Sequence, residues 1–422
     1  MGKPSIFTVV RRRNPFLLWI GQLVSTLGDN FEYIALMALA YHLSGSTLVM
    51  GGVMVAYMVP NLIFSIFSSV MVDRWDRRMT MFLSDILRGV IILIPPILLL
   101  VGKIQVWHLY LYSVLFGSVT PFFNNANSAL LPNLVRKEEY MAMNSLMQTS
   151  IQLAGILGLA LGGAAVAFLG YANAYFFDSL TFFFSAVTIF LLKIARTERA
   201  RPPEKFQISQ FLKSWFRDFK EGVLFFKVER SLLWLLLIAS MVNFAFGPIS
   251  ILLLPFVEGF LGQTVKEFGW IMSSVSLGTF LGAIFMGSLG IIRNRRSWIL
   301  FAVGALAVMT MCLPVSRFYP LAMLLLFGIG FSLPMANIPI ATVFQEKVPD
   351  NLRGRVFGVR GFLAQSLTPV STALGGMVAD LIGVRLTIFF CGVLALLVLI
   401  PSIFIPHLYG LNLQAKVEGR TE

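Results

Sequence analysis

The sequence predicts an all-α membrane protein with twelve transmembrane helices in two similar six-helix halves. Composition, the spacing of apolar runs and an internal repeat all lead to this fold class. Of the 422 residues, 57% are hydrophobic and 13% are charged, whereas soluble domains have about 25% charged residues. A water-soluble protein of this composition would have too little polar surface to cover its core. The composition therefore excludes soluble enzymes, and we expect no catalytic site.

Apolar runs of about 20 residues, long enough to cross a bilayer, alternate with charge clusters and with Gly or Pro turns. Six such runs precede a long polar stretch and six follow it. The expected spans are 15–42, 47–72, 80–101, 106–131, 142–168, 171–193, 231–257, 267–291, 297–315, 319–345, 355–383 and 385–408.

Basic residues are distributed unevenly between the two sides of the predicted membrane. Of the 33 Lys and Arg residues, 29 fall on the side of the N-terminus and four on the other side, namely Lys103, Lys266, Arg317 and Arg385. Because cytoplasmic loops carry an excess of Lys and Arg, we expect a multi-pass protein of the cytoplasmic (inner) membrane with both termini in the cytoplasm. The net charge of +13 then reflects topology and the lipid bilayer, and no nucleic-acid partner is expected.

The polar stretch divides the chain into an N-terminal half at 1–193, a cytoplasmic linker at 194–230, a C-terminal half at 231–408 and a cytoplasmic tail at 409–422. Apolar residues recur in the linker at spacings of three, four or seven, with charges between them. This pattern predicts an amphipathic helix in the membrane interface. The apolar positions are Ile208, Phe211, Leu212, Trp215, Phe219 and Phe226.

The two halves resemble each other in sequence. Residues 161–170 of span 5 and 374–383 of span 11 both begin with Leu-Gly-Gly and end with Gly, at an offset of 213. The same offset aligns Asn30 with Asn243. Two repeats of six helices indicate a transporter whose central site lies between pseudo-symmetric halves that alternate in access.

The loop after span 2 reads Asp73-Arg74-Trp75-Asp76-Arg77-Arg78. It resembles the G-x-x-x-D-R-x-x-R-R type sequence that joins spans 2 and 3 in the major facilitator superfamily, with Ser69 in place of the leading Gly. The resemblance implies that Asp73 holds a cytoplasmic gate shut by meeting the N-terminus of span 11, where the helix dipole and Arg groups favour a carboxylate. The alternative is positive-inside anchoring, which explains the Arg residues and leaves Asp73 and Asp76 unexplained.

Further stretches resemble the drug/proton antiporter branch of this superfamily, which includes macrolide-efflux and siderophore-export proteins. The resemblance covers nearly the whole chain and implies the major facilitator fold and export driven by proton entry. The matching stretches are Leu18–Gln22, Leu27–Asp29, Ser84–Arg88, Ala129–Val135, Asn144–Leu146, Asp178–Leu180 and Arg353–Val356.

Span 5 has a run of glycines that is similar to the antiporter motif, with Leu159 in place of its Pro. Small residues at such spacing let helices approach closely, so the run serves either packing or a hinge between conformations. Its members are Gly155, Gly158, Gly162 and Gly163.

Asp29 and Glu32 are three residues apart near the middle of span 1, so both project from one face of the helix. A charge at this depth costs about 2.5–3.5 kcal/mol or more, and such residues usually face a cavity and have a function. Burial and mutual repulsion oppose having both carboxylates charged, so protons and a cationic substrate compete for one place. We expect these acids to couple proton and substrate movement. The alternative is a structural acid neutralised by a neighbouring helix.

Other polar residues within the spans are candidates of lower rank. Asp85 and Arg88 in span 3 are three residues apart and are expected to form an ion pair, while Asp178 in span 6 either faces the outer vestibule or makes a local hydrogen bond. Five amide residues either line the cavity or bond neighbouring helices: Asn124, Asn127, Asn243, Asn337 and Gln345.

We expect no metal and no cofactor, with the proton gradient as the energy source. The two Cys residues lie inside apolar runs, the three His residues are far apart, and the chain contains no GxxxxGK[ST] loop. The predicted function is proton-coupled efflux of lipophilic, cationic or neutral small molecules by a monomer. One alternative is export of a specific metabolite, a siderophore or a lipid, in which case Arg88, Arg355 and Arg360 matter more. Another is a non-transporting membrane sensor on the same fold.

Overall fold

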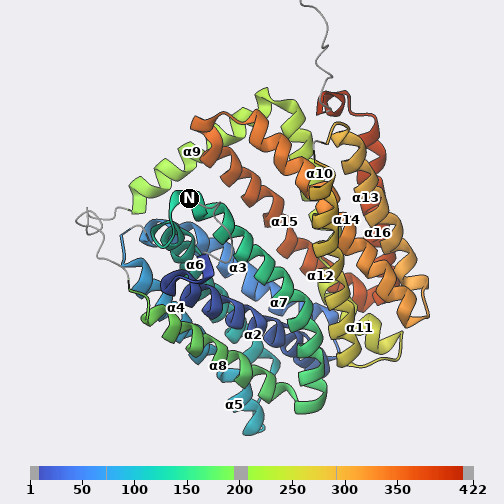
Figure 1. Cartoon of the computed structure of the whole chain (residues 1–422). Helices are drawn as coiled ribbons and strands as arrows, with labels where there is room; N and C mark the ends of the chain where they lie inside the picture. The colour runs from blue at the N-terminus through green and yellow to red at the C-terminus, as the bar shows by residue number, and fades with distance from the viewer. Residues whose placement is uncertain (1–8, 73, 194–207, 291, 412–422) are drawn as a thin grey trace, which may run out of the picture. The chain divides into compact units, whose positions relative to one another are not determined.

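The computed structural model describes residues 9–72, 74–193, 208–290 and 292–411. Within these ranges every regular element is a helix, and short loops or 3₁₀ turns join them (Figure 1). The all-α prediction is therefore confirmed.

The first part of the chain contains α2 (Arg13–Ser44), α3 (Thr47–Val72), α4 (Arg77–Ile92), α5 (Ile94–Leu100), α6 (Val106–Leu130), the 3₁₀ turns η1 (Leu131–Asn133) and η2 (Lys137–Glu139), α7 (Tyr140–Leu169) and α8 (Tyr171–Phe190). The second part contains α9 (Ile208–Val228), α10 (Arg230–Phe246), α11 (Ile249–Gly259), α12 (Val265–Ser288), α13 (Arg295–Cys312), η3 (Leu313–Val315), α14 (Tyr319–Lys347), η4 (Asp350–Leu352), α15 (Arg353–Ile382), α16 (Val384–Ile403) and η5 (Pro406–Leu411).

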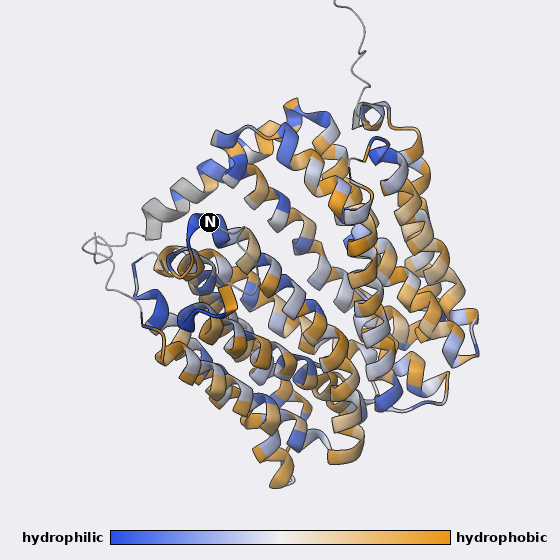
Figure 2. Cartoon of the chain, viewed as in Figure 1, coloured by the Kyte–Doolittle hydropathy of each residue, from blue (hydrophilic) through white to orange (hydrophobic). Residues whose placement is uncertain are grey.

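In the described part of the chain, nine helical segments are long and apolar enough to cross a membrane. Figure 2 shows hydrophobic residues along most helices and hydrophilic residues gathered at many helix ends and on α9. The helices α2, α6 and α15, with 32, 25 and 30 residues, are also long enough, but they carry acidic, amide or basic side chains within their length. The fold class is thus confirmed, while the count of twelve spans stays a prediction.

Two expected spans are interrupted. Span 3 divides at Leu93 into α4 and α5, just before Pro95 and Pro96, and span 7 divides at Gly247 and Pro248 into α10 and α11. Proline lacks a backbone N–H and clashes with the preceding turn, so a continuous helix cannot pass these points without a break or kink.

The internal repeat extends to the helix boundaries. Helices α7 and α15 both have 30 residues, and α8 and α16 both have 20. Each pair begins and ends at positions 213 residues apart. Gly170 separates α7 from α8 with φ of +83°, and Gly383 separates α15 from α16 with φ of +91°. Positive φ values of this kind favour glycine.

The chain forms two compact units. Unit 1 comprises Met1–Lys205 and Leu253–Ser273, and unit 2 comprises Phe206–Leu252 and Ser274–Glu422. The segment 253–273 belongs to unit 1 through close contacts there; a Cβ added to Gly163 would lie 2.8 Å from the Cα of Gly269, for example. The expected halves, 1–193 and 231–408, are defined from the sequence repeat, whereas the two units are defined by contacts between residues. The boundaries of the halves stay a prediction.

Within unit 1, α2 packs against α7 and α8, α3 packs against α6, and α4 packs between α6 and α8. Within unit 2, α13 packs against α14 and α16, and α10 packs against α15 and α16. The arrangement in unit 1 brings polar residues of α2, α4 and α6 to a common place, described below.

The amphipathic helix expected in the linker is present as α9, and it packs against α15 in unit 2. Phe226 is buried in the apolar core of this unit. Arg355 of α15 forms ion pairs with Asp218, at 3.2 Å, and with Glu221. Residues 194–207 and the tail from 412 to 422 lie outside the described residues, as do the side chains of Ile208, Phe211, Leu212 and Trp215.

Candidate functional site

A cavity of about 320 Å³ lies in unit 1 between α2, α3, α4 and α6. Its volume falls at the lower end of the range for small-molecule sites. Acidic, basic, aromatic and amide side chains line it: Asp29, Glu32, Tyr33, Leu36, Met54, Tyr57, Arg88, Tyr112, Ser113, Phe116, Thr120 and Asn124.

Glu32 enters this cavity from α2 and is held by α6. The Tyr112 hydroxyl donates a hydrogen bond of 2.8 Å to the Glu32 carboxylate, and both side chains are buried. Tyr175 of α8 packs edge-on against the Tyr112 ring, with the ring centroids 6.1 Å apart. The position of the Glu32 carboxyl group is therefore set by a fixed donor on another helix.

Asp29 lines the same cavity but has a different environment. Its side chain is half-buried, and among the described residues it has no hydrogen-bond or ion-pair partner. Its charge interacts with those of Arg88 and Asp85. Asp29 is thus a carboxyl group inside the fold, and its role in coupling stays a prediction.

Asp85 and Arg88 form the expected ion pair, and both side chains are buried. The Arg88 guanidinium lies between two aromatic rings, 4.2 Å from the centroid of Phe123 and 4.4 Å from that of Phe182. Cation–π contacts of this kind are stronger when they are desolvated. Because Asp85 compensates its charge, Arg88 contributes little net positive charge to the cavity it lines.

Asp178 is fully buried and does not line the cavity. The Thr181 hydroxyl lies 2.7 Å from the backbone carbonyl oxygen of Asp178 and 3.1 Å from its carboxylate, and it can donate its one proton to either acceptor. A Cβ added to Gly28 of α2 would lie 2.2 Å from an Asp178 carboxylate oxygen, so this acid packs directly on the helix that carries Asp29 and Glu32. Asp178 thus contacts α2 and Thr181, and a place at the outer vestibule stays a prediction.

The glycines of α7 bring this helix close to its neighbours. A Cβ on Gly158 would lie 2.9 Å from the Asn30 Cβ, and one on Gly162 would lie 3.0 Å from the Phe31 Cα. Gly163 faces α12 and Gly155 is half-buried. These contacts account for a packing role, and a hinge role stays a prediction.

The aligned asparagines Asn30 and Asn243 make similar bonds, although their acceptors lie one helical turn apart in the two repeats. Asn30 donates to the carbonyl of Ala154 on α7 at 3.3 Å, and Asn243 donates to that of Ala364 on α15 at 2.9 Å. In both repeats an amide on the first helix therefore binds the fifth span. In unit 2, Asn243 thus forms a hydrogen bond between α10 and α15.

Side chains of the loop after α3 and of the start of α4 form hydrogen bonds with backbone groups at the ends of α4, α6 and α8. Asp76 caps α4 by accepting a hydrogen bond of 2.8 Å from the Met79 backbone N–H. Arg77 donates to the carbonyl of Ala129 in α6, and Arg78 donates to those of Ile189 and Phe190 in α8. Cations are favourable at helix C-termini.

The gate itself stays a prediction for this loop. Asp73 lies outside the described residues, and Arg74 is exposed. The contacts of Asp76, Arg77 and Arg78 instead show a role in holding α4, α6 and α8 together.

The remaining amides occupy different places. Asn124 is exposed to the cavity, whereas Asn127 is half-buried on the same helix. Asn337 and Gln345 are exposed on α14 in unit 2. The structure thus brings Asp29, Glu32, Arg88 and Asn124 together in one cavity.

Sequence reasoning missed most of the cavity's contribution from α6. Tyr112, Phe116, Thr120 and Asn124 all line it, and they recur every four residues, which places them along one face of a helix. This spacing is visible in the sequence, but only Asn124 carries an amide, and aromatic and Thr side chains at helical spacing are equally common where helices pack or face lipid.

The acids and the aromatic walls define what this cavity can bind. Carboxyl groups can take up protons or pair with an organic cation, while Tyr, Phe and Met side chains offer an adaptable apolar surface. Within the described residues there is no group of three or more His, Cys, Asp or Glu side chains arranged to hold a metal ion.

Comparison with known proteins agrees with this membrane architecture. The chain is 27% identical over 415 residues to the multidrug efflux pump Tap of Mycolicibacterium fortuitum, covering 96% of this chain and 99% of that protein. It is 22% identical over 404 residues to macrolide efflux protein A of Streptococcus pyogenes, covering 94% and 97%.

Solved structures share the fold. A bacterial homologue of the human lysosomal transporter Spinster, in an inward-facing and unoccupied conformation, matches with a TM-score of 0.72 at 12% identity, covering 98% of this chain and 100% of that chain. The peptide transporter POT in complex with sulfate matches with a TM-score of 0.74 at 14% identity, covering 95% and 96%.

The family model of the Major Facilitator Superfamily matches residues 18–368 and 236–412. These two matches together extend over most of the chain. The protein is thus a multi-pass membrane transporter that belongs to the major facilitator superfamily.

Proposed function

We propose that this transporter exports lipophilic, cationic or neutral small molecules across the cytoplasmic membrane in exchange for protons. The observation that carries the proposal is the cavity of unit 1, which Asp29 and Glu32 line together with aromatic side chains. The names of two relatives, a multidrug efflux pump and a macrolide efflux protein, support the same substrate class.

The charge balance of the cavity favours a cation or protons. Arg88 is the one basic residue in its lining, and Asp85 already pairs with it. The two acids of α2 therefore require protons or a cationic substrate when the cavity is closed to water. Occupation by one excludes the other, which is the requirement for exchange.

The proton gradient is sufficient to drive such export. One proton crossing about 150 mV releases about 3.5 kcal/mol, which supports a substrate gradient of a few hundredfold. Protons entering at Asp29 or Glu32 from outside would release the substrate, and their loss to the cytoplasm would restore the site. Neither a metal nor another cofactor is required, and a monomer is sufficient.

Transport into proteoliposomes with an imposed pH gradient tests this proposal. The probe is a fluorescent lipophilic cation, and the variants are Asp29→Asn and Glu32→Gln. The control is Glu138→Gln, which removes an acidic charge from an exposed position outside the cavity. We expect gradient-driven uptake to be lost in at least one of the first two variants and retained in the control. Unchanged uptake in both variants would contradict coupling by these acids.

A specific anionic metabolite is the second candidate substrate, because Arg88 lines the same cavity. Such a substrate would compete with Asp85 for the guanidinium. Uptake of an anionic dye in place of the lipophilic cation, lost in Asp85→Asn/Arg88→Gln, would favour it. If neither probe moves and a drug panel shows no protection of an efflux-deficient host, a sensor role gains support.

A further inference from the structure

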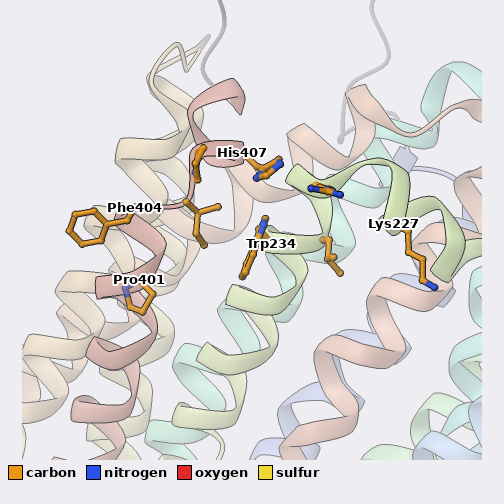
Figure 3. A pocket seen from close by; sticks show the side chains of 9 residues that line it. Lys227, Trp234, Pro401, Phe404 and His407 are labelled. Atoms are coloured by element: carbon orange, nitrogen blue, oxygen red, sulfur yellow. The ribbon is translucent and has the colours of Figure 1, made fainter.

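A second, more open pocket of about 750 Å³ lies in unit 2, where α9 meets α10 and where α16 ends (Figure 3). None of the candidate residues of the transport site belongs to it. Its lining is Lys227, Arg230, Leu233, Trp234, Pro401, Phe404, Ile405, Pro406 and His407, and we name this set the basic groove.

The walls of the basic groove are fixed by the fold. Helix α9 ends at Val228 and α10 begins at Arg230, so Lys227 and Arg230 stand on either side of one tight connection and both line the groove. On the other side, Leu408 of η5 is buried in the core of unit 2. The Arg296 guanidinium stacks on the Tyr409 ring at 3.7 Å from its centroid, which anchors the turn that carries His407.

The positive charge of the basic groove is not neutralised by the nearest acid in sequence, Glu229. Lys347 donates a hydrogen bond of 2.7 Å to Glu229, and the Ser231 hydroxyl donates another of 2.9 Å. The Lys347 bond lowers the pKa of the Glu229 carboxyl group, so this acid is ionised and already paired. In the described part of the chain, neither Lys227 nor Arg230 has an ion-pair partner.

Apart from His407, the rest of the groove is apolar and suited to lipid. Trp234 is half-buried on α10, and Phe404 is 73% exposed where α16 ends. Figure 3 shows Lys227 at one end of the groove and Phe404 and Pro401 at the other. Trp residues are enriched at the level of the headgroups, and basic pockets between helices on the cytoplasmic side bind anionic headgroups.

We propose that the basic groove binds an anionic phospholipid, with its phosphate at Lys227 and Arg230 and its glycerol and upper acyl chain along Trp234, Pro401 and Phe404. In the predicted orientation, the start of α10 and the end of α16 lie at the cytoplasmic leaflet of the membrane. The anionic headgroups of this leaflet are therefore within reach of the groove. A soluble anion would gain the charge contacts but not the apolar wall, so the mixed lining favours a lipid.

The experiment uses the purified full-length protein in a neutral detergent, titrated with phosphatidylglycerol or with phosphatidylcholine of the same chain length. The unfolding temperature and the number of lipids retained in native mass spectrometry are followed. The test variant is Lys227→Gln/Arg230→Gln. The matched control is Lys213→Gln/Lys220→Gln, which removes the same charge from exposed positions of α9 outside the groove.

Phosphatidylglycerol is expected to raise the unfolding temperature of the native protein and the control. The test variant should need about thirtyfold more of this lipid, since each basic residue near an anionic surface contributes about 1 kcal/mol. Its unfolding temperature without added lipid should equal that of the control, because both altered side chains are exposed.

Three results would overturn the proposal. If phosphatidylglycerol binds the test and control variants equally weakly, only the net charge of the protein matters. If phosphatidylcholine raises the unfolding temperature as much as phosphatidylglycerol does, the groove does not select a charged headgroup. Stabilisation by inorganic phosphate or glycerol phosphate at the same concentration as the lipid would assign the groove to a soluble anion.

Discussion

The Tyr112 hydroxyl on α6 donates a hydrogen bond of 2.8 Å to the Glu32 carboxylate on α2. This bond joins the helix that carries both acids of the cavity to the helix whose face supplies Phe116, Thr120 and Asn124. Tyr112 is therefore a positioning residue for Glu32. If Glu32 takes up the proton, this bond must weaken or change its acceptor in each cycle.

Replacing Tyr112 by Phe removes the donor and keeps the ring against Tyr175. A hydrogen bond to a charged group contributes about 1.5–3 kcal/mol, so we expect gradient-driven uptake to fall by about tenfold or more. The unfolding temperature should fall as well, because the buried Glu32 carboxyl group loses its donor in the folded state. Tyr110→Phe is the control, since Tyr110 lies on the same helix outside the cavity lining. Full uptake by Tyr112→Phe would show that Glu32 works without this donor.

Much of the helical architecture was predictable because local signals mark where helices end. The predicted span 47–72 coincides with α3, and the glycines at 170 and 383 separate helices in both repeats at positive φ. Bilayer thickness requires about 20 residues per span, which leaves few alternative ways to divide the chain. The observed boundaries of the other helices differ from the expected ones by a few residues.

The site was predictable only in part. Asp29 and Glu32 stand out because charge is costly in a membrane, and the pairing of Asp85 with Arg88 follows from their spacing. Tyr112 was missed because a tyrosine in a span has many possible partners, and its bond to Glu32 joins residues 80 positions apart. Such a contact depends on how α2 and α6 pack, which no local pattern specifies.

Gly158 offers a test that separates packing from a hinge. An alanine in an exposed helix interior stabilises by about 1 kcal/mol relative to glycine, but a Cβ here would lie 2.9 Å from the Asn30 Cβ. Overpacking costs about 1–3 kcal/mol, so Gly158→Ala should lower the unfolding temperature. Gly361→Ala on α15 meets no atom within 4 Å and should raise it slightly. An unchanged unfolding temperature with lost transport in Gly158→Ala would instead favour a hinge.

The ion pair of Glu229 and Lys347 predicts a pH-dependent contribution to stability. The Lys347 hydrogen bond lowers the pKa of Glu229 below its ordinary 4.5. The pair therefore stabilises the folded state above about pH 4.5, and this contribution is lost as the pH falls through the lowered pKa. Glu229→Gln should have a lower unfolding temperature than the native protein at pH 7, and the difference should shrink as the pH falls below 4.5 and through the lowered pKa of Glu229. Glu138→Gln, an exposed acid, should show no such difference at either pH.

The buried pair of Asp85 and Arg88 predicts a strong asymmetry between single and double substitutions. Asp85→Asn leaves the guanidinium buried between Phe123 and Phe182 without a counter-charge, which should cost about 3–5 kcal/mol. The double variant Asp85→Leu/Arg88→Met removes both charges and keeps apolar volume between the rings, so it should recover most of this loss. Thermal unfolding in detergent measures both variants. A double variant as unstable as Asp85→Asn would show that Arg88 is needed for more than its charge balance, and its contacts with the two rings would then be the next to test.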